Sequence, residues 1–337
     1  MPLAPPRPET WLRPTPAGLY CAPGDFFIDP VRPVARAVVS HGHGDHARPG
    51  NDNVLCTPAT AAIMRARLGG TAGTLQALSQ GETITVGGVV VALAPAGHVL
   101  GSAQIVLEHR GSRAVVSGDY KRRPDPTCDP FEPQACDVFV TEATFGLPVF
   151  RHAPAGAEID RLLSSLRRFP ERCHLLGVYA LGKCQRVLAL LRRAGYAEPV
   201  YLHGALIALT ELYERLGVPL GPVLPATGVA REALRGKIVL APPGALADPW
   251  SRRLPDPLAA SASGWMRVRQ RAKAAGIELP LVISDHADWD ELTATLADVA
   301  AAEVWVTHGR EEALVHYAIK AGHRARALAL TGYEEEE

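Results

Sequence analysis

The chain has 337 residues, of which 47% are hydrophobic and 21% are charged, and its 35 basic and 35 acidic residues balance to a formal net charge of +0. This composition is typical of a globular protein, and the balanced charge excludes a protein that coats nucleic acid through an overall basic field. No apolar run approaches the roughly 18 residues of a membrane span, and the N-terminus lacks the apolar core of a signal peptide, so we expect a soluble, cytoplasmic protein.

The first part of the chain predicts mainly strands. Apolar runs bounded by Gly and Pro predict strands at 35–40, 83–97, 103–109, 113–118 and 137–143. From about residue 155, strand and helix patterns alternate, as in the apolar run 175–180 and the helical pattern 182–195. The stretch 244–264 is rich in Pro, Ala and Ser and is expected to be irregular. The segments 279–292 and 303–314 each predict a buried strand that passes through a polar corner into a helix.

Three histidines and one aspartate crowd into the segment 41–46, "HGHGDH". In a tight turn the side chains of His41 and His43 can converge on one ion, while Asp45 and His46 can serve a second. The intervening glycines let the backbone bend closely around an ion. A hydrogen-bonded surface loop is the common explanation of a single HxH pair, but the full HxHxDH pattern is more specific and indicates two metals.

Further candidate ligands stand where apolar strands end. His98 lies in "APAGHVLGSA", Asp119 in "VVSGDY", where it could bridge two cations, and His308 in "VWVTHG". Each alone is more often a hydrogen-bonded polar residue than a ligand. Several such corners in one chain favour a metal site, because open metal sites draw nitrogen and oxygen ligands from several loops on a rigid scaffold.

These motifs carry a resemblance to a known family. The segments "HGHGDH", "AGHVLGSA", "SGDY", "TEATFG", "SDHAD" and "THG" occur in the order seen in metallo-β-lactamase-fold nucleases of the β-CASP group. With "GLYCAPGDFFIDP" at its front, the chain most resembles the bacterial ligase-associated DNA exonucleases. The resemblance implies an α/β (α+β) fold: an αββα metallo-β-lactamase sandwich at 1–145 and 280–337, with an inserted β-CASP α/β cap domain at 146–279.

The resemblance also implies a role for each site residue. It assigns one metal to His41, His43 and His98, the other to Asp45, His46 and His308, and a bridging position to Asp119. The expected ions are Zn²⁺, with Mn²⁺ as the alternative. Asp29 matches an acidic residue that supports the histidine loop from behind. Glu142 and His286 match the β-CASP acidic and histidine motifs and would form a carboxylate–imidazole pair that donates to the phosphate and its leaving oxygen. The expected catalytic residues are Asp45, Asp119, Glu142 and His286.

The implied chemistry is phosphodiester hydrolysis. Two divalent ions can lower the pKa of a water molecule and neutralise the charge that develops on phosphorus-bound oxygens. The resemblance implies a 5′-to-3′ exonuclease on single-stranded DNA, active in DNA repair and functionally associated with a DNA ligase and other repair enzymes. The basic stretches 121–124, 251–253 and 267–273 could follow a phosphate backbone, with a solvated surface as the alternative.

Three alternatives remain open at the level of the sequence. The histidine motif reads "SDH" where RNA-processing relatives tend to have "SAH", and the inserted domain is shorter than in many relatives, so an RNA-processing nuclease of the same fold is one alternative. A small-molecule metallo-hydrolase that acts on a lactam, lactone or thioester is the second. A nucleic-acid-binding scaffold without catalysis is the third, although the expected ligand set is complete.

Overall fold

The computed structural model describes residues 4–328 and 330. It consists of two compact units, one formed by Met1–Arg151 with His286–Glu337 and the other by His152–Asp285. The chain leaves the first unit once and returns to it, so the second unit is an insertion. The assignment of 1–145 with 280–337 as a catalytic core and of 146–279 as a cap stays a prediction.

The first unit begins with a six-stranded sheet in the order of the sequence. Its first three strands are antiparallel and the others are parallel. The strands are β1 (Leu12–Thr15), β2 (Gly18–Cys21), β3 (Phe26–Ile28), β4 (Arg36–Val38), β5 (Asn53–Cys56) and β6 (Thr74–Ala77). Helix α1 (Pro58–Leu68) connects the last two. It starts where the Thr57 hydroxyl accepts a hydrogen bond from the Thr60 amide, and Pro58 occupies the first helical turn.

A second sheet of the same unit has the order β19-β18-β11-β10-β9-β8-β7. Its strands are β7 (Thr83–Val86), β8 (Val89–Pro95), β9 (Ala103–His109), β10 (Ser112–Val116), β11 (Val138–Ala143), β18 (Glu303–Gly309) and β19 (Arg324–Ala327). The strand structure expected at 83–97 is confirmed, and it is a hairpin of two strands, because Gly87 and Gly88 turn the chain with φ of +54° and +80°.

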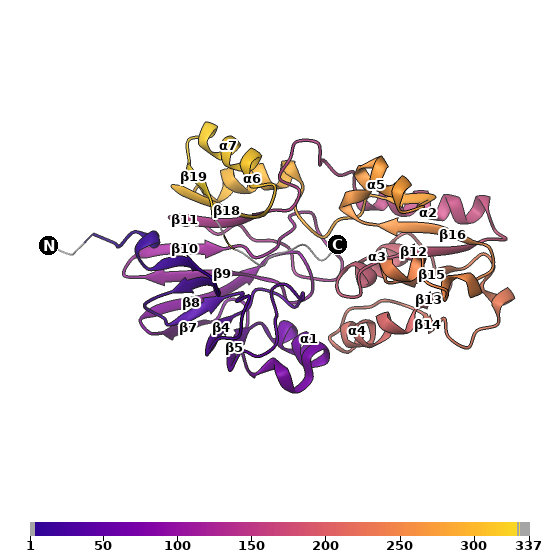
Figure 1. Cartoon of the computed structure of the whole chain (residues 1–337), viewed down its shortest axis with the longest axis horizontal. Helices are drawn as coiled ribbons and strands as arrows, with labels where there is room; N and C mark the ends of the chain where they lie inside the picture. The colour runs from indigo at the N-terminus through magenta and orange to yellow at the C-terminus, as the bar shows by residue number, and fades with distance from the viewer. Residues whose placement is uncertain (1–3, 329, 331–337) are drawn as a thin grey trace. The chain divides into compact units, whose positions relative to one another are not determined.

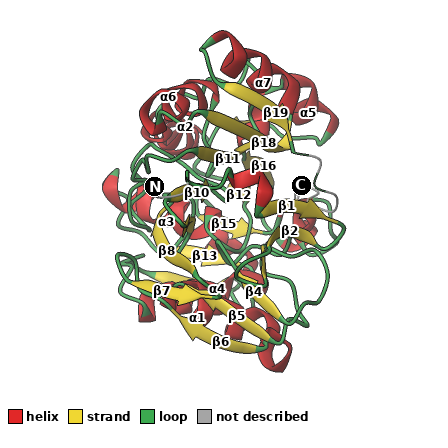
Figure 2. Ribbon diagram, turned by 90° about the vertical axis from the view of Figure 1, so that its left-hand side faces the viewer, coloured by secondary structure: helices red, strands yellow, loops and turns green. Residues whose placement is uncertain are grey.

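Alternating side chains of the second sheet divide between two cores. Along β11, Val138 and Val140 join a buried cluster that also contains residues of β1–β5, so the two sheets share one core. Phe139 points to the other face, into a cluster with α6 (Trp289–Val299) and α7 (Glu311–Lys320). Helix α1 packs in the same way on the first sheet, where Met64 shares a cluster with Val54. Both views show α6 and α7 beside β18 and β19 (Figures 1 and 2).

The second unit is built on a six-stranded parallel sheet in the order β14-β13-β15-β12-β16-β17. Its strands are β12 (Cys173–Gly177), β13 (Val200–Leu202), β14 (Val223–Pro225), β15 (Ile238–Ala241), β16 (Pro257–Ala262) and β17 (Leu279–Leu281). Its helices are α2 (Ala155–Arg168), α3 (Lys183–Arg193), α4 (Gly204–Arg215) and α5 (Arg269–Ala274). The alternation of strand and helix after residue 155 is therefore confirmed.

One sequence prediction in this unit is wrong. The stretch 244–264, expected to be irregular, contains β16, which pairs with β12 on one side and β17 on the other. Its alternate residues Leu258, Ala260 and Ala262 are buried. The alanines and serines of this strand are small, so they give a weak hydrophobic signal although the strand lies inside the sheet.

The mixed α/β class predicted from the sequence is confirmed. Among the residues that the structure describes, none of the helices combines the length and the apolar character required to cross a lipid bilayer.

Candidate metal centre

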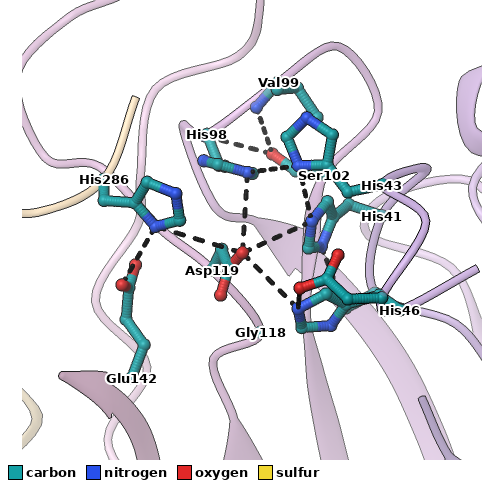
Figure 3. A network of polar contacts seen from close by, with 12 residues as sticks. His41, His43, His46, His98, Val99, Ser102, Gly118, Asp119, Glu142 and His286 are labelled. Carbon is teal, nitrogen blue, oxygen red and sulfur yellow. Dashed lines mark hydrogen bonds and ion pairs between the residues drawn. The ribbon is translucent and has the colours of Figure 1, made fainter. Parts of the chain in front are cut away.

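Sequence-predicted ligands from several strand ends meet in the first unit, and Figure 3 shows His41, His43, His46, His98 and Asp119 side by side. The segment 41–46 follows β4, His98 follows β8, Asp119 follows β10, and His308 lies in β18. His41 is fully buried and His46 and His98 are each 1% exposed. Loops far apart in the sequence therefore bring their polar side chains into one buried cluster.

Four donor atoms form the first group, from His41, His43, His98 and Asp119. His43 Nδ1 lies 3.1 Å from His41 Nε2 and 3.0 Å from His98 Nε2. Asp119 Oδ2 lies 3.5 Å from His41 Nε2 and 3.7 Å from His98 Nε2. Ligands on a tetrahedral ion with bonds of about 2.0–2.1 Å stand about 3.3–3.4 Å apart. The observed separations bracket that value, so this group fits one divalent ion.

The second group contains Asp45, His46 and the same Asp119. His46 Nε2 lies 3.4 Å from Asp119 Oδ2 and 3.5 Å from Asp45 Oδ2. His308 is not part of this group, but its ring stacks on that of His46 with 5.2 Å between the centroids and 24° between the planes. The backbone of His308 has a φ of +56°, an uncommon conformation for a residue with a Cβ. Asp119 thus belongs to both groups, and His308 lies beside the second.

Asp29 holds the histidine loop from behind. Its carboxylate accepts hydrogen bonds from the Ser40 amide at 2.7 Å and the Ser40 hydroxyl at 2.6 Å, and it lies 2.8 Å from His46 Nδ1. The Ser40 hydroxyl also lies 3.0 Å from His41 Nδ1. Partners on the far nitrogen of an imidazole fix its tautomer and its orientation toward a metal. This arrangement directs the Nε2 atoms of His41 and His46 into the cluster.

The loop that carries Asp119 packs directly on this support. Gly118, with a φ of +55°, lies so close that an added Cβ would stand 2.7 Å from Ser40 Cβ and Oγ. A larger residue would therefore push Asp119 away from the histidine loop.

The electrostatics of the cluster suit a bound cation. Burial lowers the pKa of His41 well below its ordinary value and that of His308 to about 4, so both rings are neutral at pH 7, the form that ligates metals. Burial raises the pKa of Asp119, but His46 and His286 outweigh this and hold it well below its usual range. Burial also disfavours a proton on His46, yet the carboxylates of Asp45, Asp119 and Asp29 raise its pKa well above the ordinary value. The carboxylates therefore attract positive charge to this position.

Glu142 and His286 form the expected pair beside the first group. Glu142 is fully buried in β11, where the pairing with β18 shifts register between Thr141 and Ala143. Such a bulge redirects a side chain. His286 Nδ1 lies 3.0 Å from Glu142 Oε2 and 4.0 Å from Asp119 Oδ2. Asp119, Glu142 and His286 form a third group, in which one ligand atom from each residue lies within 4.8 Å of the other two.

Sequence reasoning did not single out several residues that support the site. Ser40 contacts both Asp29 and His41, the Thr144 hydroxyl donates to Glu142 Oε2, and an Arg67 guanidinium nitrogen donates to the Gly42 carbonyl in the histidine loop. Ser40 stands directly before the histidine motif and could have been considered. Arg67 gives no local signal, because its partner lies 25 residues away.

Comparison with known proteins finds several relatives. A protein of Opitutus terrae named "Probable DNA ligase" is 31% identical over 307 residues, which cover 87% of this chain and 28% of that protein. The cleavage and polyadenylation specificity factor subunit 3 of Dictyostelium discoideum is 35% identical over 121 residues, or 34% of this chain and 15% of that protein. Ribonuclease TTHA0252 of Thermus thermophilus is 30% identical over 151 residues, or 43% of this chain and 35% of that protein. These relatives are metallo-β-lactamase-fold β-CASP nucleases and fit the family that the motifs of this chain resemble.

The chain spans well under half the length of these curated relatives. A search against protein-family models found no match. Among solved structures, a protein of unknown function from Enterococcus faecalis V583 superimposes with a TM-score of 0.59 at 13% identity, over 88% of this chain and 80% of that one. At that identity the likeness concerns the fold alone.

The support by Asp29 generates a testable prediction. Asp29→Asn keeps the size of the side chain but removes the charge that faces His46 Nδ1, so we expect the affinity for Zn²⁺ to fall about 10–100-fold. Competition with a chromophoric chelator measures this, with Asp52→Asn as an exposed control that should bind as the unaltered protein does. Equal affinity in Asp29→Asn and Asp52→Asn would contradict the supporting role.

Proposed function

We propose that this protein is a metal-dependent nuclease that hydrolyses phosphodiester bonds in DNA. The observation that carries the proposal is the position of Asp119 Oδ2, which lies 3.4–3.7 Å from imidazole nitrogens of His46, His41 and His98 and 4.0 Å from His286 Nδ1. One carboxylate oxygen thus lies beside two potential metal positions. It also lies near the partly exposed imidazole of His286, which can act on a substrate.

The proposed cofactors are two divalent ions, with Zn²⁺ favoured by the imidazole-rich donors and Mn²⁺ as the alternative. His41, His43 and His98 would hold one, Asp45, His46 and His308 the other, and Asp119 would contact both. Such a pair of ions, when bound, supplies a nucleophile at neutral pH and stabilises the charge that develops on the phosphoryl oxygens. The proposed architecture is an αββα core with a β-CASP cap, supported by the core that the two sheets of the first unit share and by the helices on their other faces.

Glu142 and His286 would act on the substrate. Glu142 accepts a hydrogen bond from a protonated Nδ1 of His286 and so orients the ring. In the imidazolium form the opposite nitrogen, Nε2, also carries a proton and would donate it to a phosphoryl oxygen or to the departing oxygen. His286 has a side chain that is 26% exposed, whereas Glu142 is fully buried, which suits a donor that meets substrate and a partner that does not.

The choice of DNA rests on how much of the chain each relative matches. The relative named as a DNA ligase aligns with 87% of this chain, whereas the two relatives named for RNA processing or ribonuclease action align with 34% and 43%. We propose 5′-to-3′ exonuclease action on single-stranded DNA in repair, alongside a DNA ligase. The 5′-to-3′ direction of cleavage is proposed because the sequence motifs resemble those of β-CASP exonucleases. An RNA-processing nuclease is the second candidate, favoured by relatives named endoribonucleases.

We predict close to two metal ions per chain in the purified protein, because two donor groups share Asp119. Elemental analysis measures this number. Asp119→Ala and His43→Ala should abolish hydrolysis, since the first removes the shared ligand and the second opens the first group. Dialysis against a chelator should abolish the activity, and added Zn²⁺ or Mn²⁺ should restore it. Full turnover with one ion or none would refute the dinuclear centre.

A second prediction separates His286 from the metal ligands. His286→Ala should keep both ions but lose about 10²–10⁴-fold in rate, the usual contribution of a proton donor or acceptor. Paired measurements of metal content and single-turnover rate test this, with His316→Ala on the exposed face of α7 as control. Loss of an ion in His286→Ala would make His286 a ligand instead.

The last prediction concerns substrate and polarity. A 5′-labelled single strand of DNA should lose its label as short products at the earliest times, while a 3′-labelled strand shortens progressively and the products carry 5′-phosphates. Denaturing gels of both substrates, with an RNA strand of equal sequence beside them, measure this. Early release of a 3′ label would reverse the polarity, and faster cleavage of RNA would favour the second candidate.

A further inference from the structure

Lys121 stands two residues after Asp119 in the segment 121–124, which as a basic stretch could have followed a phosphate backbone. Its side chain is instead only 3% exposed. A buried ammonium is stable only where acceptors and a counter-charge surround it, so the contacts of Lys121 reveal what it organises.

The ammonium group reaches the segment that carries His286. Lys121 Nζ donates a hydrogen bond of 3.1 Å to the backbone carbonyl of His286 and lies 3.4 Å from Glu291 Oε2. Lys121 and His286 are separated by 165 residues along the chain, so the hydrogen bond joins two distant segments. The bond therefore acts on the position of the main chain from which the imidazole projects.

Glu291 continues the same connection from the other side. Its Oε1 accepts hydrogen bonds from the amides of Arg122 at 3.0 Å and Arg123 at 2.7 Å. Its Oε2 accepts from the amide of Asp288 at 3.1 Å, in the capping box at the start of α6. One buried carboxylate thus joins the loop after Asp119 to the helix that follows His286.

Backbone contacts bring a third loop to the same point. The Lys121 amide donates to the Ala96 carbonyl at 3.0 Å, next to the loop that carries His98. Gly97, with a φ of +75°, lies against Lys121, and an added Cβ would stand 2.1 Å from the Lys121 carbonyl oxygen. The Ala287 amide donates to the Tyr120 carbonyl, and the Tyr120 amide donates to Glu142 Oε1 at 2.8 Å. The loops of His98, Asp119 and His286 therefore converge on the residues around Lys121.

We propose that Lys121, with Glu291 as its counter-ion, is a positioning residue that holds the backbone of His286 at the distance from Glu142 and Asp119 needed for hydrolysis. The proposal rests on the proposed function, because it assumes that His286 acts on the substrate. Neither residue touches substrate or metal. Lys121 has this role because its side chain extends from the Asp119 loop and its ammonium donates a hydrogen bond to the His286 carbonyl.

The test is a double-mutant cycle. Lys121→Met keeps the length of the side chain but removes its charge and its donors. We expect kcat on the DNA substrate to fall about 10–100-fold, the cost of displacing a catalytic group by about 1 Å, with the metal content retained and KM changed by less than about twofold. In a His286→Ala background the same substitution should have no further effect on kcat, because it acts through His286. Lys320→Met, at the exposed end of α7, is the matched control and should leave kcat unchanged.

A second measurement does not depend on activity. In protein with labelled histidine rings, Lys121→Met should shift the NMR resonances of His286 and leave those of His316 in place. An equal loss of kcat in both backgrounds, loss of a metal ion, or unshifted His286 resonances would overturn the proposal. If Lys121→Met does not fold, Glu291→Gln takes its place under the same criteria. Absence of metal-dependent cleavage by the unaltered protein would refute the proposed function, and the NMR result would then decide the positioning role alone.

Discussion

The buried negative charge of Asp119 is the constraint around which the first unit is arranged. An isolated carboxylate in a protein interior is costly, and here it is surrounded by imidazoles whose tautomers are set by residues behind them. Ser40 and Asp29 orient the histidine loop, and Gly118 lets the aspartate loop approach it without a gap. The two sheets of the first unit hold the site loops in place. Both sheets contribute residues to one core, so the loops that follow β4, β8 and β10 start from strands that are packed together.

Around the charge of Asp119, the buried imidazoles and the partly exposed His286 occupy different environments. His41, His46 and His98, which face the shared carboxylate, are fully or almost fully buried, whereas His286 is partly exposed and contacts Glu142. Glu142 in turn depends on the irregular pairing of β11 with β18, which places its carboxylate toward the site rather than in the regular alternation of the strand. In the proposed function, metal binding and substrate activation would therefore depend on different supporting residues that meet at a single carboxylate oxygen, Asp119 Oδ2.

The clustering of histidines and aspartates could be predicted from the sequence because HxHxDH is a local pattern and because metal chemistry restricts the residue types that can serve as ligands. The mixed α/β class was equally readable, since strand and helix differ in the period of their apolar residues. Features that depend on contacts between residues far apart in the sequence could not be predicted. Lys121 stands in a basic stretch that resembles a phosphate-binding surface, yet its side chain is buried and contacts His286 and Glu291, 165 and 170 residues away. The strand β16 was missed because small residues leave little hydrophobic pattern.

The insertion of the second unit has a consequence for biosynthesis. Strand β11 is completely buried in the finished protein, yet its neighbour β18 is encoded after the whole insertion. At about 5–20 residues per second, the roughly 150 residues between Arg151 and Glu303 take roughly 8–30 s to emerge. During that interval β11 is an apolar edge strand of the nascent chain, open to pairing with other chains. A ribosome that pauses inside the insertion would prolong this exposure, so in the cell the yield of native protein depends on translation speed and on chaperones that cover nascent strands.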